Sequence, residues 1–169
     1  MDGGKAVSDA DAEVSEAIDF AEYYAESAEA WASTEGLELT PRGLTVITPP
    51  WNFPLAIPLG GAFAALVAGN PVILKPARET AYIATRAAEI CHAAGIPQEV
   101  LQLVVATDDV ATELITNPTV ATVVLTGGTS TARLFKRLRP DLHLLAETGG
   151  KNATIVSRFA DRDLAGDAI

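Results

Sequence analysis

The feature that most constrains the fold of this chain is an alternation between short apolar runs and longer helical stretches. Apolar runs of strand length lie at 44–47, 72–74, 101–105, 122–125, 142–146 and 153–156. Stretches of helical length lie between them, at 55–68, 80–94, 109–115 and 129–138. Because strands and helices alternate in this way, we expect neighbouring strands to be parallel and joined by helical crossovers.

This pattern predicts an α/β fold with a Rossmann-like, mainly parallel sheet and helices on both faces. A long acidic helix is expected at 9–33, capped by Ser8 or Asp9, before an α/β core at 43–169. We interpret the acidic face of this helix as a solvated surface; the alternative is an interaction surface. Ligands of such sheets bind beyond the carboxyl ends of the strands.

Composition and charge argue against several classes of partner. The chain has 169 residues, of which 49% are hydrophobic, so it is long enough for one domain with a core. Its net charge of −10 argues against nucleic acid or an anionic membrane surface as a partner. The apolar stretch 54–73 is interrupted by prolines and glycines, so no integral membrane segment is expected.

The cysteine and histidine content points to a cytoplasmic protein without a metal site. Cys91 is the only cysteine, so no internal disulfide can form, and residues 1–5 lack the apolar core of a secretory signal. The two histidines and one cysteine provide no metal-ligand cluster. Cys91 occupies an apolar position of a helical stretch and is expected in the core rather than in catalysis. His143 alternates with leucines in a strand and is expected to be structural or exposed.

Two polar residues follow predicted strands. Asn52 lies among prolines after 44–47, where its amide can donate to an oxygen that becomes negative during a reaction; the alternative is a rigid turn in which Asn52 satisfies local backbone groups. Lys75 follows 72–74, where it can meet a ribose or phosphate; the alternative is a solvated charge at a strand end.

Two further segments follow later strands. The turn 126–131 is rich in glycine and joins a strand to a helix, so its amides can bind a pyrophosphate; the alternative is a tight turn with a Ser or Thr cap. Glu147 follows 142–146 and can act as a general base; alternatively it caps a turn or pairs with Lys151. If these segments act together, one crevice gathers the Asn52 amide, the Lys75 ammonium and the Glu147 carboxylate.

Together these segments resemble the aldehyde dehydrogenase superfamily over nearly the whole chain. The more specific similarity is to the Δ1-pyrroline-5-carboxylate dehydrogenases, which oxidise L-glutamate γ-semialdehyde to glutamate in proline catabolism and in some cases form half of a bifunctional proline utilisation protein. The motifs that carry the resemblance are Pro49-Pro50-Trp51-Asn52-Phe53-Pro54, Lys75-Pro76-Ala77, Ala10 to Phe20 with Tyr23-Tyr24-Ala25-Glu26, Arg137-Leu138-Arg139-Pro140 and Glu147 to Ala153.

The resemblance implies a role for each motif in NAD-dependent aldehyde oxidation. Asn52 would donate to the oxyanion, and Glu147 would activate the water that hydrolyses a thioester formed on the family's cysteine. Lys75 would hold the adenosine ribose of NAD, and Gly149 would let the backbone pass close to the nicotinamide. The remaining cofactor-binding positions implied by the resemblance are Pro50, Trp51, Thr126, Gly127, Gly128 and Thr129.

The sequence also departs from the family pattern. Arg78 stands where many relatives have a glutamate that grips the ribose, so the choice between NAD and NADP stays open, and Gly128 replaces a common serine. No cysteine follows Glu147. We therefore expect residues 1–169 to be part of a dinucleotide-binding domain, without the catalytic cysteine domain and inactive alone. The parent protein is expected to form a homo-oligomer or part of a bifunctional proline-oxidising polypeptide. The alternatives are a dehydrogenase for another aldehyde, or a non-catalytic nucleotide-binding module.

Overall fold

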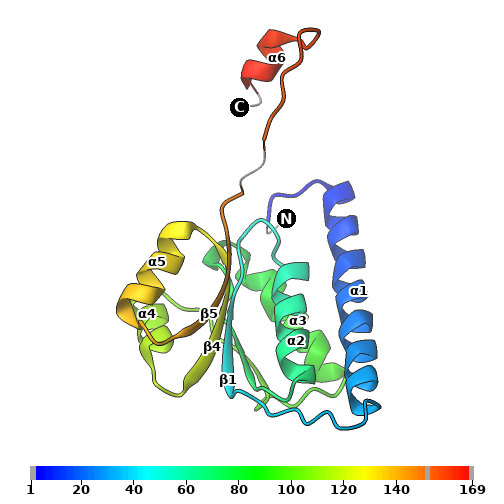
Figure 1. Cartoon of the computed structure of the whole chain (residues 1–169), viewed down its shortest axis with the longest axis vertical. Coiled ribbons are helices and arrows are strands. Elements are labelled where there is room, and N and C mark those ends of the chain that lie inside the picture. The colour runs from blue at the N-terminus through cyan, green and yellow to red at the C-terminus, as the bar shows by residue number, and fades with distance from the viewer. Residues whose placement is uncertain (1–2, 151–152, 168–169) are drawn as a thin grey trace.

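The computed structural model describes residues 3–150 and 153–167, and a five-stranded parallel sheet forms its centre (Figure 1). The strands are β1 (Leu44–Thr48), β2 (Val72–Leu74), β3 (Leu101–Leu103), β4 (Val120–Gly127) and β5 (His143–Thr148). The helices are α1 (Val7–Ala32), α2 (Ala56–Val67), α3 (Ala81–Ala93), α4 (Asp108–Thr116), α5 (Thr129–Leu138) and α6 (Arg162–Asp167), with a 3-10 turn η1 (Arg78–Thr80). The predicted α/β class with a parallel sheet is confirmed.

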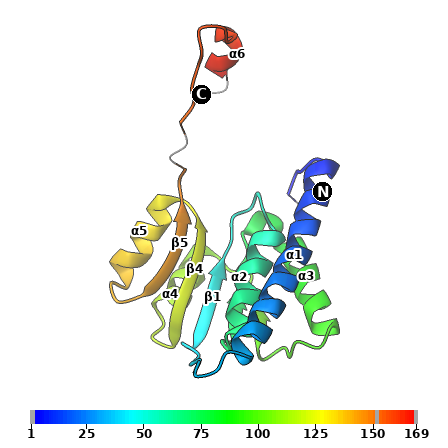
Figure 2. The same cartoon turned by 45° about the vertical axis from the view of Figure 1, so that its right-hand side comes forward.

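Two apolar cores lie on opposite faces of the sheet because strand residues alternate in direction. Ile47 packs with α1, α2 and α3, whereas its neighbour Val46 packs with α4 and α5. Figure 2 shows α4 and α5 on one side of β1, β4 and β5, with α1, α2 and α3 on the other. Helices therefore cover both faces, as predicted from the alternation.

Strand order places a topological switch at the centre of the sheet. The order is β3-β2-β1-β4-β5, and every adjacent pair is parallel. The chain adds β2 and β3 on one side of β1 and then returns to add β4 and β5 on the other. The chain segments that follow the carboxyl ends of β1 and β4 therefore lead away from each other. Such a switch point opens a crevice in which ligands bind.

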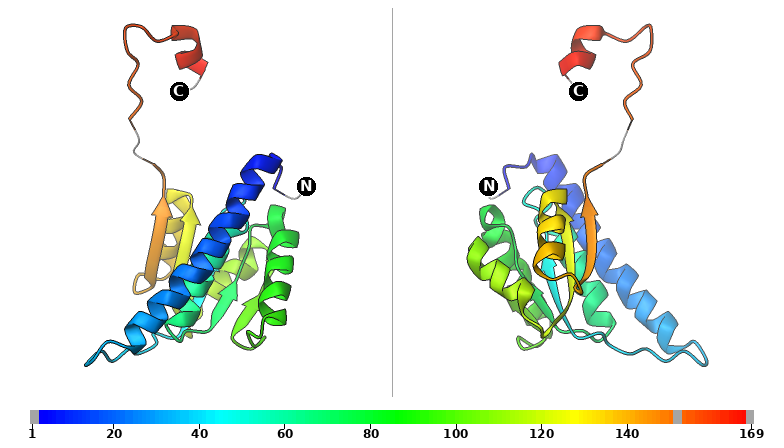
Figure 3. Two further views of the ribbon diagram at one scale, coloured as in Figure 1. Left: turned by 90° about the vertical axis from the view of Figure 1, so that its right-hand side faces the viewer. Right: turned by 60° about the vertical axis from the view of Figure 1, so that its left-hand side comes forward.

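Helix α1 packs along α2 through a close contact (Figures 2 and 3). A Cβ atom added at Gly60 of α2 would lie 2.9 Å from the ring of Phe20 on α1, so only glycine permits this approach. The expected cap is wrong: α1 begins at Val7 after Ala6, and no side chain caps it. Most of the helix's acidic residues are exposed, but Glu13 is buried.

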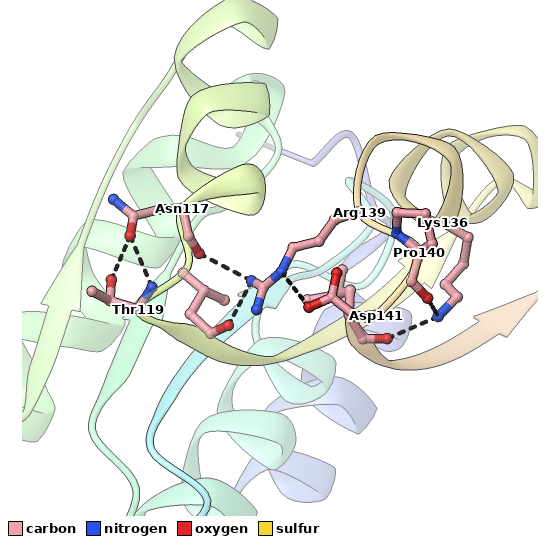
Figure 4. A network of polar contacts seen from close by, with 8 residues as sticks. Asn117, Thr119, Lys136, Arg139, Pro140 and Asp141 are labelled. Atoms are coloured by element: carbon pink, nitrogen blue, oxygen red, sulfur yellow. Dashed lines mark hydrogen bonds and ion pairs between the residues drawn. The ribbon is translucent and has the colours of Figure 1, made fainter.

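An arginine network ties together the amino ends of β4 and β5 (Figure 4). Nη1 of Arg139 donates to the carbonyl oxygens of Asn117, at 3.0 Å, and Val120, at 2.6 Å. Nζ of Lys136 donates to the carbonyl oxygens of Pro140 and Leu142, at 2.6 and 3.0 Å. This part of the sequence is remote from the carboxyl ends of the strands and therefore has a structural role.

One predicted strand differs from the structure. The strand expected at 153–156 is wrong, because residues 153–156 pair with none of the five strands and are exposed. An apolar run forms a strand only where a partner satisfies its backbone groups. Residues 153–167, including α6, extend past the carboxyl ends of the strands (Figure 3). None of the helices in the described residues is long and apolar enough to cross a membrane.

Candidate functional site

A pocket of about 330 Å³ lies at the switch point between β1, β4 and β5. Its walls come from the loop after β1, the start of α2 and the ends of β4 and β5. The lining residues are Pro50, Asn52, Phe53, Ile57, Thr126, Gly127, Glu147, Thr148, Gly149 and Gly150. The fold therefore brings together Asn52 and Glu147, which are distant in the sequence, at the edge where a parallel sheet binds ligands.

Asn52 is held on a loop that has few backbone donors. Pro49, Pro50 and Pro54 lack an N–H group and restrict the backbone on both sides. The Asn52 side chain is exposed, and it makes no hydrogen bond with any other residue in the described part of the chain. Its amide is therefore free to donate to an oxygen in the pocket.

Glu147 lies within β5 rather than after it, because the strand continues to Thr148. In the parallel register Glu147 pairs with Thr126, and Thr148 pairs with Gly127. The carboxylate is exposed and lines the pocket with Asn52. The alternative partner, Lys151, lies outside the described residues. The position suits a carboxylate that removes a proton from water in the pocket.

The turn from β4 into α5 presents an uncapped helix N-terminus. Gly128 occupies the N-cap position of α5, and no side chain caps the helix. The Ser or Thr cap that was the alternative interpretation of this turn is therefore not formed. Gly149 comes close to this end: its φ is +42°, and a Cβ atom there would lie 3.3 Å from Oγ1 of Thr129. Free amides at the start of α5 can bind a phosphate group.

Lys75 lies at the same edge of the sheet but does not line this pocket. It follows β2, and within the described part of the chain its Nζ makes only a long contact, 3.4 Å, with the carbonyl oxygen of Pro76. Burial lowers the pKa of Lys75 from its ordinary value of 10.5, and the nearby carboxylate of Asp108 opposes this change. Asn52 and Glu147 therefore line one pocket, whereas Lys75 lies at the same edge of the sheet without lining it.

Lys75 is outside the pocket because of the strand order. β2 lies on the side of β1 that faces away from β4 and β5. A dinucleotide is long enough to reach from one side of β1 to the other along the carboxyl edge, so the two positions suit different parts of one extended ligand.

A second pocket, of about 490 Å³, adjoins the first because Asn52 and Phe53 line both. Sequence reasoning missed its residues on and before α1, which include Lys5, Asp9, Glu13 and Glu16, together with Gly3, Gly4, Ala12 and Trp51. The signal was present, since Asp9, Glu13 and Glu16 are spaced by four and three residues and so share one helix face.

Cys91 lies in the core formed by α3 and the sheet, as predicted. Burial raises the pKa of the Cys91 thiol, which disfavours the thiolate needed by a nucleophile. Among the described residues there is no cluster of three or more His, Cys, Asp or Glu residues that could hold a metal ion.

The family model described as "Aldehyde dehydrogenase family" matches residues 1–169. The chain belongs to the aldehyde dehydrogenase family. This confirms the resemblance inferred from the motifs, and membership implies a nicotinamide dinucleotide, NAD or NADP, as the cofactor.

The chain is similar to proteins named PutA, for proline utilisation, and to 1-pyrroline-5-carboxylate dehydrogenases. It is 46% identical over 176 residues to the bifunctional protein PutA of Rhizobium meliloti, a match covering 99% of this chain and 14% of that protein. It is 36% identical over 189 residues to 1-pyrroline-5-carboxylate dehydrogenase 1 of Halalkalibacterium halodurans, covering 99% of this chain and 36% of that protein. The structure of Proline Utilization A from Corynebacterium freiburgense superposes with a TM-score of 0.84 at 45% identity, covering 89% of this chain and 16% of that one.

Proposed function

We propose that this chain supplies the nucleotide-binding part of an NAD-dependent dehydrogenase that oxidises L-glutamate γ-semialdehyde to glutamate in proline catabolism. The observation that carries the proposal is that Asn52 and Glu147 line one pocket at the switch point of the sheet. The relatives named for this reaction or for proline utilisation support the choice of substrate. The chain spans 14% to 36% of the length of these two sequence relatives, so further parts of the site would come from beyond it.

In the proposed reaction a cysteine from outside this chain attacks the aldehyde carbon. The Asn52 amide donates a hydrogen bond to the oxygen that becomes negative, and such a donor contributes about 10²–10³ in rate. Glu147 then removes a proton from water, which attacks the thioester carbon and releases the acid. Asn52 therefore acts before the oxidation step and Glu147 after it.

The residues at the carboxyl edge fit a dinucleotide. The N-terminus of α5 has no capping side chain, so its amides are free to bind a phosphate group. Gly127 and Gly149 line the pocket, and Gly149 lies close to Thr129 at the start of α5. Lys75 can donate to ribose hydroxyl groups on the other side of β1. Pro50 and Trp51, on the loop after β1, line the two pockets at this edge of the sheet. When bound, the dinucleotide accepts the hydride released from the aldehyde carbon.

The second pocket supports an amino-aldehyde as the substrate. Asp9 and Glu16 are exposed carboxylates in that pocket, which shares Asn52 and Phe53 with the first one. A carboxylate pair can bind the ammonium group of glutamate semialdehyde while its aldehyde reaches Asn52. We also propose a cytoplasmic location, and a homo-oligomer or a bifunctional proline-oxidising polypeptide as the assembly.

A substrate panel on the full-length protein that contains this sequence tests the proposal. NADH formation should be fastest with glutamate semialdehyde, slower with simple aliphatic aldehydes of similar length, and sensitive to Glu16→Gln through KM. Faster oxidation of the uncharged aldehydes would contradict the proposed substrate. No oxidation of any aldehyde would favour a non-catalytic nucleotide-binding module.

A parallel measurement addresses residues 1–169 alone. We expect the purified chain to form no NADH from glutamate semialdehyde above the level of a Glu147→Gln variant. Turnover above that control would contradict the proposal that the nucleophile lies outside this chain.

A further inference from the structure

The buried carboxylate of Glu13 on α1 binds the segment that follows Asn52. Glu13 is only 4% exposed. Its Oε1 accepts hydrogen bonds from the backbone N–H groups of Leu55, at 2.8 Å, and Ala56, at 3.2 Å. These amides start α2, which has no capping side chain at its own N-cap position. Glu13 therefore caps α2 from a different helix, and its charge is favourable at a helix N-terminus.

The second oxygen of the same carboxylate binds Lys5. Oε2 of Glu13 lies 2.5 Å from Nζ of Lys5. That Nζ also lies 3.8 Å from the centre of the Phe53 ring, a cation–π contact. The Lys5 side chain is 17% exposed, so both charges of the pair are largely shielded from water. The Glu13 carboxylate therefore holds the first turn of α2 directly and the ring of Phe53 through Lys5.

Asn52 lies directly before these two fixed points and has no comparable contact of its own. None of the hydrogen bonds among the described residues involves Asn52. The position of its amide is therefore set by its neighbours, of which Phe53 is held by Lys5 and Leu55 by Glu13. An oxyanion donor must be placed to within a fraction of an ångström, and a 1 Å displacement can reduce the rate about 10²-fold.

We propose that Glu13, together with Lys5, is a positioning residue for the Asn52 amide. The proposal rests on the proposed function, because it takes Asn52 as the donor to the oxyanion. The contact between α1 and the loop that carries Asn52 then has a role in the reaction as well as in folding.

The first test measures kcat and KM for variants of the full-length protein that contains this sequence. Glu13→Ala should lower kcat about 10- to 100-fold, with a smaller change in KM, because the amide is displaced. Glu13→Gln keeps an acceptor for the amides of Leu55 and Ala56 and should recover part of the loss. Glu22→Ala, an exposed position on the same helix, is the control and should behave like the wild type.

A double-mutant cycle with Asn52→Ala separates positioning from general stability. If Glu13 acts through Asn52, adding Glu13→Ala to Asn52→Ala should change kcat less than about 3-fold. A full multiplicative loss in the double variant would overturn the proposal. If Glu13→Ala does not fold, Lys5→Met replaces it in the same cycle, with the same two outcomes.

Amide hydrogen exchange gives a readout independent of catalysis. In the chain 1–169, Glu13→Ala should accelerate exchange at Leu55 and Ala56, whereas Glu22→Ala should not. Unchanged exchange at both amides would overturn the positioning role even in an active enzyme. Absence of turnover in the wild-type full-length protein would instead contradict the proposed function, so the two failures are distinguishable.

Discussion

Thr126 on β4 and Glu147 on β5 are register partners in adjacent parallel strands. Register partners in a sheet project from the same face, so the Glu147 carboxylate is held beside the turn that leads into α5. The next pair, Gly127 and Thr148, continues the ladder to the pocket. The proposed base and the proposed cofactor turn are therefore fixed relative to each other by backbone hydrogen bonds rather than by a flexible loop.

In its charged form, Lys75 should lower the free energy of unfolding of the chain. Burial lowers the pKa of Lys75 in the folded chain. Below that folded-state pKa the buried charge lowers the free energy of unfolding by its full amount, and this loss disappears as pH rises towards the ordinary pKa of 10.5. Lys75→Met should therefore be more stable than the wild type at pH 7, and the difference should shrink at pH 10. Urea denaturation midpoints at the two pH values measure this. Arg133→Met, at an exposed position, is the control, and an equal pH trend there would contradict the explanation.

Arg139 should contribute to stability without affecting the candidate site. Removing its guanidinium takes one donor away from each of the carbonyl oxygens of Asn117 and Val120, although that of Asn117 still accepts from the N–H group of Val120 (Figure 4). Arg139→Met should lower the free energy of unfolding by about 1–3 kcal/mol. Arg137→Met, an exposed neighbour, should change it by less than about 0.5 kcal/mol. Equal losses in chemical denaturation would show that the contacts of Arg139 are not responsible.

Gly60 should tolerate no side chain. An added Cβ would lie 2.9 Å from the half-buried ring of Phe20, which is packed between α1 and α2 and cannot move away without separating them. Gly60→Ala should destabilise the chain by about 1–3 kcal/mol. Gly166→Ala, whose Cβ meets no atom within 4 Å, is the matched control and should cause no loss. A thermal shift that is the same for both variants would refute the close-packing explanation.

The alternation of apolar runs predicted the fold well because local pattern and sheet topology agree. Each of the five strands was expected within a few residues, since buried parallel strands such as β2 are continuous apolar runs. The run at 153–156 looked the same locally, but strand formation depends on a partner that sequence pattern does not reveal. Pairing is a property of the tertiary structure, and this run has no partner strand among the described residues.

The candidate site was predictable where a residue follows a strand and not where it depends on a distant contact. Asn52 and Glu147 were expected to meet because both follow strands of one parallel sheet. Lys75 lies outside their pocket, and the sequence does not show this because the order of strands across the sheet is not encoded in their order along the chain. The capping of α2 by Glu13 joins positions far apart in the sequence. The spacing of Asp9, Glu13 and Glu16 places them on one helix face, but it does not reveal which segment that face contacts.

The proposed division of labour between Asn52 and Glu147 is tested most directly by rapid-mixing measurement of NADH in the full-length protein. Because Glu147 acts after hydride transfer, Glu147→Gln should retain a burst of about one NADH per site and lose steady-state turnover by roughly 10²–10⁴-fold. Asn52→Ala should slow the burst itself by roughly 10²–10³-fold. Normal steady-state turnover in Glu147→Gln, or loss of its burst, would contradict the assignment.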